Sequence, residues 1–346
     1  MRGGPYRAAA WRAKSYSVTP GGTNISIQVG VREDEWAQHL REKTRAGLAS
    51  TPPWIPPVWF YDEVGSQLFD RITQLPEYYP TNAERSILAR HADEIVALAD
   101  VDTVVELGAG SSEKSRLLFD AGVRHGRLER LVPLDCSETY LAACAAELAN
   151  SYPTLSVQGV VADFTSHLGQ LVRSDRRMVM FMGSTIGNFD ADDRASFLRD
   201  IATDQGPGDC FLVGTDLGKD TSRLLRAYDD DQGVTARFNL NALSVMNSQL
   251  DADFEVDAFR HRAWWDDRTK RIQMHLVATR DTCATVGAFD ELRVEVREGK
   301  HLLTEYSTKF TRDQVHQELA AVGLAVLGSW TDEKGDFLVT LARRAG

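Results

Sequence analysis

The feature that most constrains the fold is an alternation of short apolar runs with helical segments between residues 103 and 216. Each run is bounded by glycine, aspartate or other turn residues, and most of the segments between runs have helical periodicity. The expected strands are Thr103–Leu107, Leu131–Leu134, Leu155–Val161, Arg177–Met182 and Cys210–Gly214. Strands joined by helices form parallel sheets with right-handed crossovers, so the pattern predicts an α/β fold.

The pattern changes after Asp216. Phe259–Trp265, Arg271–Thr279 and Leu292–Val296 resemble strands without intervening helices, which predicts an antiparallel insertion. A helix over Arg312–Val322 and a terminal hairpin over residues 325–341 would then complete a seven-stranded sheet.

The N-terminal region has its own signals. Four prolines between residues 52 and 61 are too many for a helix. Four aromatic residues in the same stretch provide too much apolar surface for a solvated linker, so we expect an irregular segment that packs against the protein. Thr81 is expected to cap a helix that runs to about Ala99, with Glu84 completing a capping box. Residues 1–30 lack apolar periodicity and are expected to be a disordered leader.

The composition of the chain indicates which kinds of binding partner are disfavoured. The chain has 39 basic and 50 acidic residues, a net charge of −11, which disfavours binding to nucleic acid or to an anionic membrane. No apolar run approaches the ~18 residues of a membrane span. The four cysteines form no C-x-x-C pair, so we expect reduced thiols, no metal site and a cytoplasmic location. A small-molecule substrate is the better interpretation.

The first strand-to-helix turn carries Glu106, Gly108 and Gly110. Glycines at this turn let a ligand approach the backbone. The dinucleotide fingerprint needs a third glycine where this chain has Glu113, and a carboxylate at Glu106 suits a cationic amino-acid end better than a pyrophosphate. The turn therefore favours S-adenosylmethionine over NAD, although a purely structural turn is the alternative.

Acidic residues also end the next two strands. Asp135 can accept hydrogen bonds from both ribose hydroxyls, and Asp163 from the adenine amino group, with Phe164 stacking on the purine. Each aspartate alone could instead cap a helix. Acids at three successive strand ends favour an S-adenosylmethionine site.

Other polar groups suggest a substrate site. The fourth strand ends in the stretch Gly183–Asn188, whose glycines and amide suit a polar substrate beside the methyl donor. Tyr61, Tyr78, Tyr79 and Tyr228 carry hydroxyls, although a lone tyrosine is more often a core residue. Glu305 and Ser307 share one face of a strand, which is solvent by default or a paired recognition surface.

Several of these stretches carry a family resemblance. From about Trp59 to its C-terminus the chain resembles the L-histidine Nα-methyltransferases of ergothioneine biosynthesis, a histidine-specific, S-adenosylmethionine-dependent family. The matching stretches are Trp59–Asp62, Leu75–Thr81, Gly183–Asn188, Arg226–Asp229 and Thr304–Ser307.

The resemblance implies a class I methyltransferase with a Rossmann-like seven-stranded sheet and a second α+β domain. Residues 83–217 and 308–346 would bind the donor, and residues 31–82 and 218–307 the substrate.

The resemblance also implies a role for each matched residue. Gly108 and Lys114 would contact the methionine end of the donor, Asp135 the ribose, and Asp163 and Phe164 the adenine. Tyr78 and Tyr228 would hold the substrate carboxylate. Asn188, with Gly183, Thr185 and Tyr61 nearby, would orient the α-amine. Glu305 and Ser307 would bind the imidazole, with Met274 and Phe69 lining the pocket.

The implied reaction transfers three methyl groups to the α-amine of L-histidine and gives Nα,Nα,Nα-trimethylhistidine (hercynine). An imidazole satisfies both Glu305 and Ser307, whereas an indole has one donor and leaves one of them unpaired. Methylation of another amino acid or an indole amine is the alternative, as is a non-catalytic S-adenosylmethionine-binding module. We expect a monomer whose partners are the donor, L-histidine and the mono- and dimethylated intermediates, without a metal.

Overall fold

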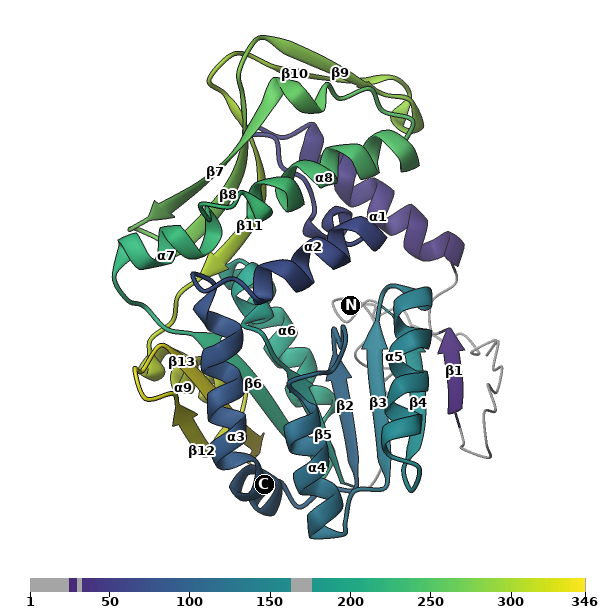
Figure 1. Cartoon of the computed structure of the whole chain (residues 1–346), viewed down its shortest axis with the longest axis vertical. Helices are drawn as coiled ribbons and strands as arrows, with labels where there is room; N and C mark the ends of the chain where they lie inside the picture. Colours follow the sequence, from purple (N-terminus) through teal and green to yellow (C-terminus); the bar gives the residue numbers. More distant parts are fainter. Residues whose placement is uncertain (1–24, 30–32, 163–175, 346) are drawn as a thin grey trace, which may run out of the picture.

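The computed structural model of the chain describes residues 25–29, 33–162 and 176–345. A large mixed sheet forms one part of the molecule, and two smaller antiparallel sheets with helices lie beyond the carboxyl ends of its parallel strands (Figure 1).

The large sheet has eight strands in the order β1-β4-β3-β2-β5-β6-β13-β12. Strands β1 to β6 are parallel to one another. Strand β13 runs antiparallel to both of its neighbours, β6 and β12, so β12 has the same direction as β1 to β6. Their bounds are β1 Ile25–Val29, β2 Thr103–Leu107, β3 Arg130–Asp135, β4 Ser156–Val161, β5 Arg177–Phe181, β6 Cys210–Asp216, β12 Leu324–Thr331 and β13 Phe337–Arg344. The α/β fold predicted from the alternation of runs is confirmed.

The order in which strands are added to the sheet reverses beside β2. From β2 the chain builds outward through β3 and β4 on one side and through β5 and β6 on the other. Ligands of open α/β sheets bind at the carboxyl ends of strands on either side of such a switch point. The turns that follow β2 and β5, which begin with Gly108 and Gly183, therefore start side by side.

Helices cover both faces of the large sheet. Because successive strand side chains point to opposite faces, Val104 packs into a core with α3, α4 and α5, and Val105 into a core with α6 and α9. These helices are α3 Tyr79–Ala99, α4 Arg116–His125, α5 Glu138–Ser151, α6 Ala191–Asp204 and α9 Arg312–Ala321.

The second part of the molecule has a separate core. Sheets β11-β8-β7 and β10-β9 pack with four helices around residues such as Phe238, Leu276 and Leu302 (Figure 1). Its elements are α1 Glu33–Leu48, the 3-10 helix η1 Pro57–Phe60, α2 Glu63–Thr73, α7 Thr221–Tyr228, α8 Val234–Gln249, the 3-10 helices η4 Val256–Ala258 and η5 Gly287–Phe289, β7 Phe259–Asp266, β8 Arg271–Ala278, β9 Thr282–Val286, β10 Leu292–Val296 and β11 His301–Thr308. The predicted antiparallel insertion is confirmed, and β9 is an additional strand.

Two expectations about the N-terminal region are wrong. The sheet has eight strands rather than seven because Ile25–Val29, inside the expected disordered leader, pairs in parallel with β4 and buries Ile25 and Ile27. Residues 1–24 lie outside the described residues. The proposed domain boundaries stay a prediction.

The expected capping box is also wrong. Helix α3 begins at Tyr79, two residues before Thr81, and its N-cap makes no side-chain hydrogen bond. Glu84 is fully buried and reaches the turn after β5 instead of the helix N-terminus. Among the helices described, none is long and apolar enough to cross a membrane.

Arg177, at the start of β5, provides a test of what stabilises the sheet. The Arg177 side chain is buried and donates to Asp209 Oδ2 (3.0 Å) and to Asp204 Oδ2 (2.5 Å), both on buried carboxylates. We expect Arg177→Met to lower the free energy of unfolding by about 3–5 kcal/mol, because two buried carboxylates lose their cation. Urea denaturation measures the change.

Arg90→Met is the matched control. Arg90 pairs with Glu333 on the surface, so its loss should cost less than about 1 kcal/mol. Equal losses in the two variants would contradict the assignment.

Candidate functional site

A cavity lies between the turn after β5 and the second part of the molecule. Its empty space, part of which is open to solvent, amounts to about 550 Å³. All ten residues expected to form the substrate site line it: Tyr61, Phe69, Tyr78, Gly183, Thr185, Asn188, Tyr228, Met274, Glu305 and Ser307. The structure thus brings together residues separated by up to 246 positions in the sequence.

Aromatic rings form one wall of the cavity. The ring centroids of Tyr61 and Phe69 lie 5.8 Å apart, those of Phe69 and Tyr78 6.4 Å, and those of Tyr78 and Tyr228 6.1 Å, in edge-to-face pairs. Phe238 from α8 also lines the cavity and packs against Tyr61. Edge-to-face contacts hold the rings rigidly, so their faces and hydroxyls have defined directions. No described residue hydrogen-bonds the Tyr78 hydroxyl, which leaves this group for a ligand.

Strand β11 contributes Glu305 and Ser307, which alternate with Tyr306 and share one face. Within the described part of the chain, the Glu305 carboxylate has no hydrogen-bond partner. Burial among the cavity walls raises the pKa of Glu305 to about 7, although Lys309 opposes this shift. An acceptor of this kind favours a ligand that brings a hydrogen-bond donor or a positive charge.

The turn after β5 forms the floor. It contains the 3-10 helix η3 Thr185–Asn188, which packs against β11. A Cβ on Gly187 would lie 3.0 Å from the Thr308 carbonyl oxygen, so a larger residue would require the backbone at Thr308 to shift by a few tenths of an ångström. Asn188 is thereby held at the same cavity as Glu305.

The turn after β2 has the form expected of a donor site. Gly108 and Gly110 have φ values of 66° and 52°, and a Cβ on Gly110 would meet only open space, so the backbone is accessible to a ligand. At the end of β3, Asp135 accepts from the backbone N–H groups of Ser137 (3.0 Å) and Gly110 (3.3 Å). The expected contacts of these residues with the ribose and methionine ends of S-adenosylmethionine stay predictions. Asp163 and Phe164, expected at the adenine, lie outside the described residues.

Glu106 is buried beneath this turn. It accepts a hydrogen bond from the Ser112 hydroxyl (2.6 Å) and another from the Ser115 hydroxyl. Burial raises the pKa of Glu106 to about 7, and the two hydroxyls oppose the shift. Glu106 thus ties the glycine turn to the start of α4, and its expected contact with a donor's amino group stays a prediction.

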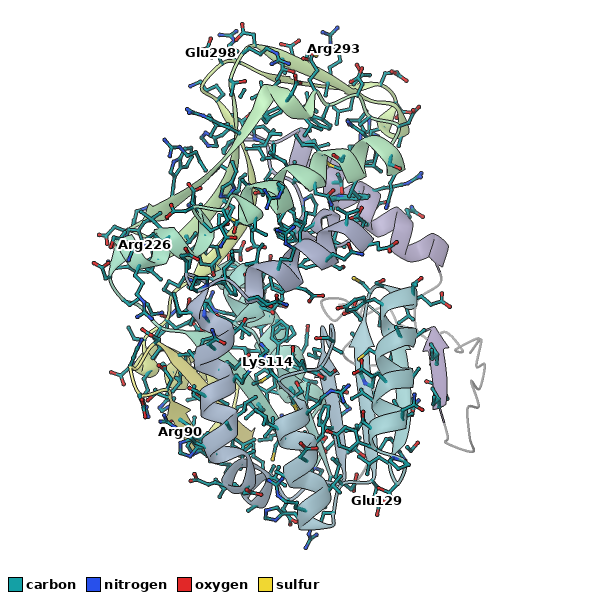
Figure 2. All side chains as sticks on the ribbon, viewed as in Figure 1. Arg90, Lys114, Glu129, Arg226, Arg293 and Glu298 are labelled. Carbon is teal, nitrogen blue, oxygen red and sulfur yellow. The ribbon has the colours of Figure 1, made fainter. Side chains whose placement is uncertain are left out.

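Lys114 lies between the donor turn and the substrate cavity. Figure 2 shows it near the centre of the molecule, whereas Arg293 and Glu298 lie at the top of the view, on and just after β10. Its ammonium pairs with Glu84, which also accepts from the Gly183 backbone N–H (2.9 Å). Lys114 therefore links the two turns through Glu84, and its expected contact with the donor stays a prediction.

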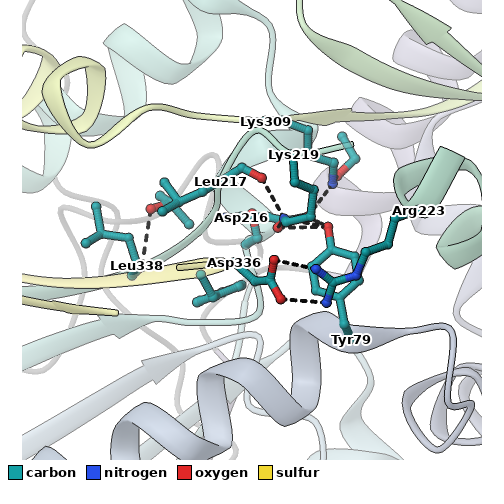
Figure 3. Close-up of polar contacts among 12 residues, drawn as sticks. Tyr79, Asp216, Leu217, Lys219, Arg223, Lys309, Asp336 and Leu338 are labelled. Carbon is teal, nitrogen blue, oxygen red and sulfur yellow. Dashed lines mark hydrogen bonds and ion pairs between the residues drawn. The ribbon is translucent and has the colours of Figure 1, made fainter. Parts of the chain in front are cut away.

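Sequence reasoning missed a buried polar network behind the cavity. Asp216, the last residue of β6, accepts from Lys309 Nζ (2.7 Å), Lys219 Nζ (2.5 Å) and the Tyr79 hydroxyl (2.7 Å) (Figure 3). Burial alone would raise the pKa of Asp216, but the two lysines outweigh burial and lower it. The neighbouring Arg223 forms a bidentate pair with Asp336 and also lies over the Tyr79 ring (Figure 3).

Two signals in the sequence could have located this network. Asp216 ends a strand, as Asp135 does, and Lys309 continues the every-second-residue spacing of Glu305 and Ser307. Glu84 had no such signal, because its spacing from Thr81 matches a capping box. Among the described residues, no group of three or more His, Cys, Asp or Glu side chains is arranged to hold a metal ion.

Comparisons with known proteins agree with the motifs. The sequence model of a family described as "Histidine-specific methyltransferase, SAM-dependent" matches residues 40–344. The chain is 47% identical over 320 residues to the histidine N-alpha-methyltransferase of Mycobacterium tuberculosis, covering 92% of this chain and 99% of that protein. Identity to the protein of the same name from Mycolicibacterium smegmatis is 48%, with the same coverage.

A fungal relative is more distant. The chain is 30% identical over 306 residues to ergothioneine biosynthesis protein 1 of Neurospora crassa, covering 84% of this chain and 34% of that protein. The resemblance inferred from the sequence motifs is confirmed. Because the family match spans most of its length, the chain belongs to the S-adenosylmethionine-dependent, histidine-specific methyltransferases.

Proposed function

We propose that this protein transfers three methyl groups from S-adenosylmethionine to the α-amine of L-histidine, giving hercynine for ergothioneine biosynthesis. The names of the two mycobacterial relatives support the substrate, and the name of the fungal relative supports the pathway. The chain's own cavity supplies an independent argument.

The observation that carries the proposal is the pairing of Glu305 with Ser307 on one wall of that cavity. An imidazole has two ring nitrogens, one a donor and the other an acceptor when neutral, and both donors when protonated. Glu305 accepts, and the Ser307 hydroxyl can donate or accept. Ser307 also contacts the Tyr228 hydroxyl. If Ser307 donates to Tyr228, it acts as a second acceptor toward the ring, and the pair then complements a protonated imidazole, which has two N–H donors.

An indole ring fits this pair less well. It has a single N–H donor, so either Glu305 or Ser307 would be buried without a partner. An unpaired buried polar group costs about 1–3 kcal/mol, or roughly a tenfold to hundredfold loss in affinity. Histidine is therefore favoured over tryptophan.

The remaining cavity residues are proposed to orient the reacting amine. Bound S-adenosylmethionine supplies an electrophilic methyl group, and the nucleophile must be a neutral amine. Asn188 and Tyr61 are proposed to hold this amine, while Tyr78 and Tyr228 hold the carboxylate. Such positioning can contribute several kcal/mol to the barrier reduction. Aromatic faces such as that of Tyr61 also tolerate the bulky cation that forms as methyl groups accumulate.

The chain is proposed to form two domains. Residues 31–82 with 218–307 are proposed as a substrate domain, and 83–217 with 308–346 as a donor domain. The separate apolar cores support this division. A cytoplasmic monomer acting without a metal or nucleic acid completes the proposal.

Incubation with substrate and donor tests the reaction directly. We expect L-histidine to gain one, two and then three methyl groups, followed by mass spectrometry, because the α-amine of histidine can accept three. L-Tryptophan at equal concentration is the competitor. Methylated tryptophan without methylated histidine would refute the substrate assignment.

Single substitutions should separate the two binding sites. Glu305→Ala is expected to weaken L-histidine binding by about 10- to 100-fold, because the ring loses its acceptor, while S-adenosylmethionine binding is retained. Asp135→Ala should do the converse, because it removes the proposed ribose contact together with the hydrogen bonds that Asp135 accepts from Gly110 and Ser137 in the donor turn. Calorimetry with each ligand separately measures both affinities. Loss of donor affinity in Glu305→Ala equal to its loss of histidine affinity would show that the assignment is wrong.

The pKa of Glu305 predicts how stability depends on pH. Its pKa is about 7 in the folded protein and near 4.5 ordinarily, so the folded state binds the proton more tightly and loses stability as pH rises through 7. Relative to wild type, Glu305→Gln should therefore gain up to about 3 kcal/mol in free energy of unfolding between pH 5 and pH 8. Urea denaturation at several pH values measures this difference.

Glu298→Gln is the control, because Glu298 is exposed. It should show no such pH dependence. A pH-independent difference between wild type and Glu305→Gln would contradict the raised pKa.

A further inference from the structure

Lys309 occupies a position that the proposed reaction does not explain. It follows Ser307 by two residues at the end of β11, and its side chain is completely buried. Its ammonium lies 2.7 Å from Asp216 Oδ2, 2.9 Å from the Tyr228 hydroxyl and 2.7 Å from the Ser307 hydroxyl. An ammonium has three protons, so all three are used by these contacts.

These contacts determine what the two hydroxyls can offer. Tyr228 and Ser307 both accept from Lys309, and their oxygens lie 2.7 Å apart. One hydroxyl proton fills the contact between them. The other proton must point elsewhere, and the cavity that both residues line is the available direction. Lys309 therefore orients a hydrogen-bond donor toward the cavity.

The charges that act on Lys309 are the carboxylates of Asp216 and Glu305 and the ammonium of Lys219. Asp216 carries one negative charge and contacts two ammonium groups, those of Lys309 and Lys219. Among the described residues that line the cavity, Glu305 is the only one with a charge-bearing side chain, and no lysine or arginine reaches the wall. A carboxylate that enters the cavity thus meets no cation directly, and Lys309 is buried immediately behind the Tyr228 hydroxyl.

We propose that Lys309 is a positioning residue that makes the site specific for substrates with a carboxylate. It orients the Tyr228 hydroxyl toward the carboxylate and supplies the compensating positive charge from behind. This inference rests on the proposed function, in which Tyr228 holds the carboxylate of histidine. Amines that have the imidazole but lack the carboxylate, such as histamine, are then rejected because the hydroxyl proton that Lys309 directs into the cavity has no acceptor.

Two lysine substitutions test the proposal against a merely structural role. Lys309→Met removes the cation next to Tyr228 and Ser307. Lys219→Met is the matched control, because Lys219 pairs with the same Asp216 and is also buried, but its described contacts are with Tyr79, Asp216 and the Leu217 carbonyl. Calorimetry measures the affinity of each variant for L-histidine and for histamine, and steady-state kinetics gives kcat and KM for L-histidine.

The ratio of the two affinities is the decisive readout. In Lys309→Met we expect histidine affinity to fall about 10- to 100-fold, histamine affinity to change less than threefold, and the loss in turnover to appear mainly in KM. In Lys219→Met the ratio should stay within about threefold of wild type. Equal losses for both ligands in Lys309→Met, or the same change of ratio in Lys219→Met, would overturn the proposal.

A measurement on the wild-type protein covers the case in which Lys309→Met does not fold. L-Histidinamide has the shape of histidine but no negative charge, so it should bind at least tenfold more weakly than L-histidine. Equal binding of the two would overturn the role of Lys309. If wild-type protein neither binds nor methylates L-histidine, the proposed function itself fails, and the two failures are therefore distinguishable.

Discussion

The ion pair between Asp216 and Lys309 is the interaction on which the site depends, because it connects the two parts of the molecule next to the cavity. Asp216 ends β6 of the large sheet, and Lys309, which it binds, follows β11 of the smaller sheet. Its backbone N–H also donates to the Ser184 hydroxyl (2.9 Å), in the turn after β5. One residue thus aligns the floor of the cavity with the wall that carries Glu305 and Ser307.

A second carboxylate performs a similar task on the donor side. Glu84 from α3 binds both Lys114, near the glycine turn after β2, and the Gly183 backbone N–H, in the turn after β5. Gly214 makes room for it, since a Cβ there would lie 2.2 Å from Glu84 Oε1. Buried carboxylates are tolerated only when cations and N–H groups satisfy them, so each also restricts how the surrounding turns can move.

The sequence predicted most strands of the large sheet and the residues that line the cavity. Strand ends and glycine turns are local signals, because short apolar runs and turn residues are read within a few positions. The alternation of Glu305 with Ser307 likewise follows from strand geometry alone. Motif resemblance then supplied the aromatic residues, which no periodicity would have distinguished from core tyrosines.

Local patterns by themselves determined the α/β class, the order of the elements and which polar residues end the parallel strands. Tertiary structure alone decided the partners of those residues. Glu84 has the spacing of a helix cap but binds Gly183, 99 residues away, and Lys309 binds Asp216, 93 residues away. Ile25–Val29 became a strand because β4 offered it a free edge and a buried surface. Pairing of buried charges and strands depends on which groups meet in space, and spacing along the chain does not contain that information.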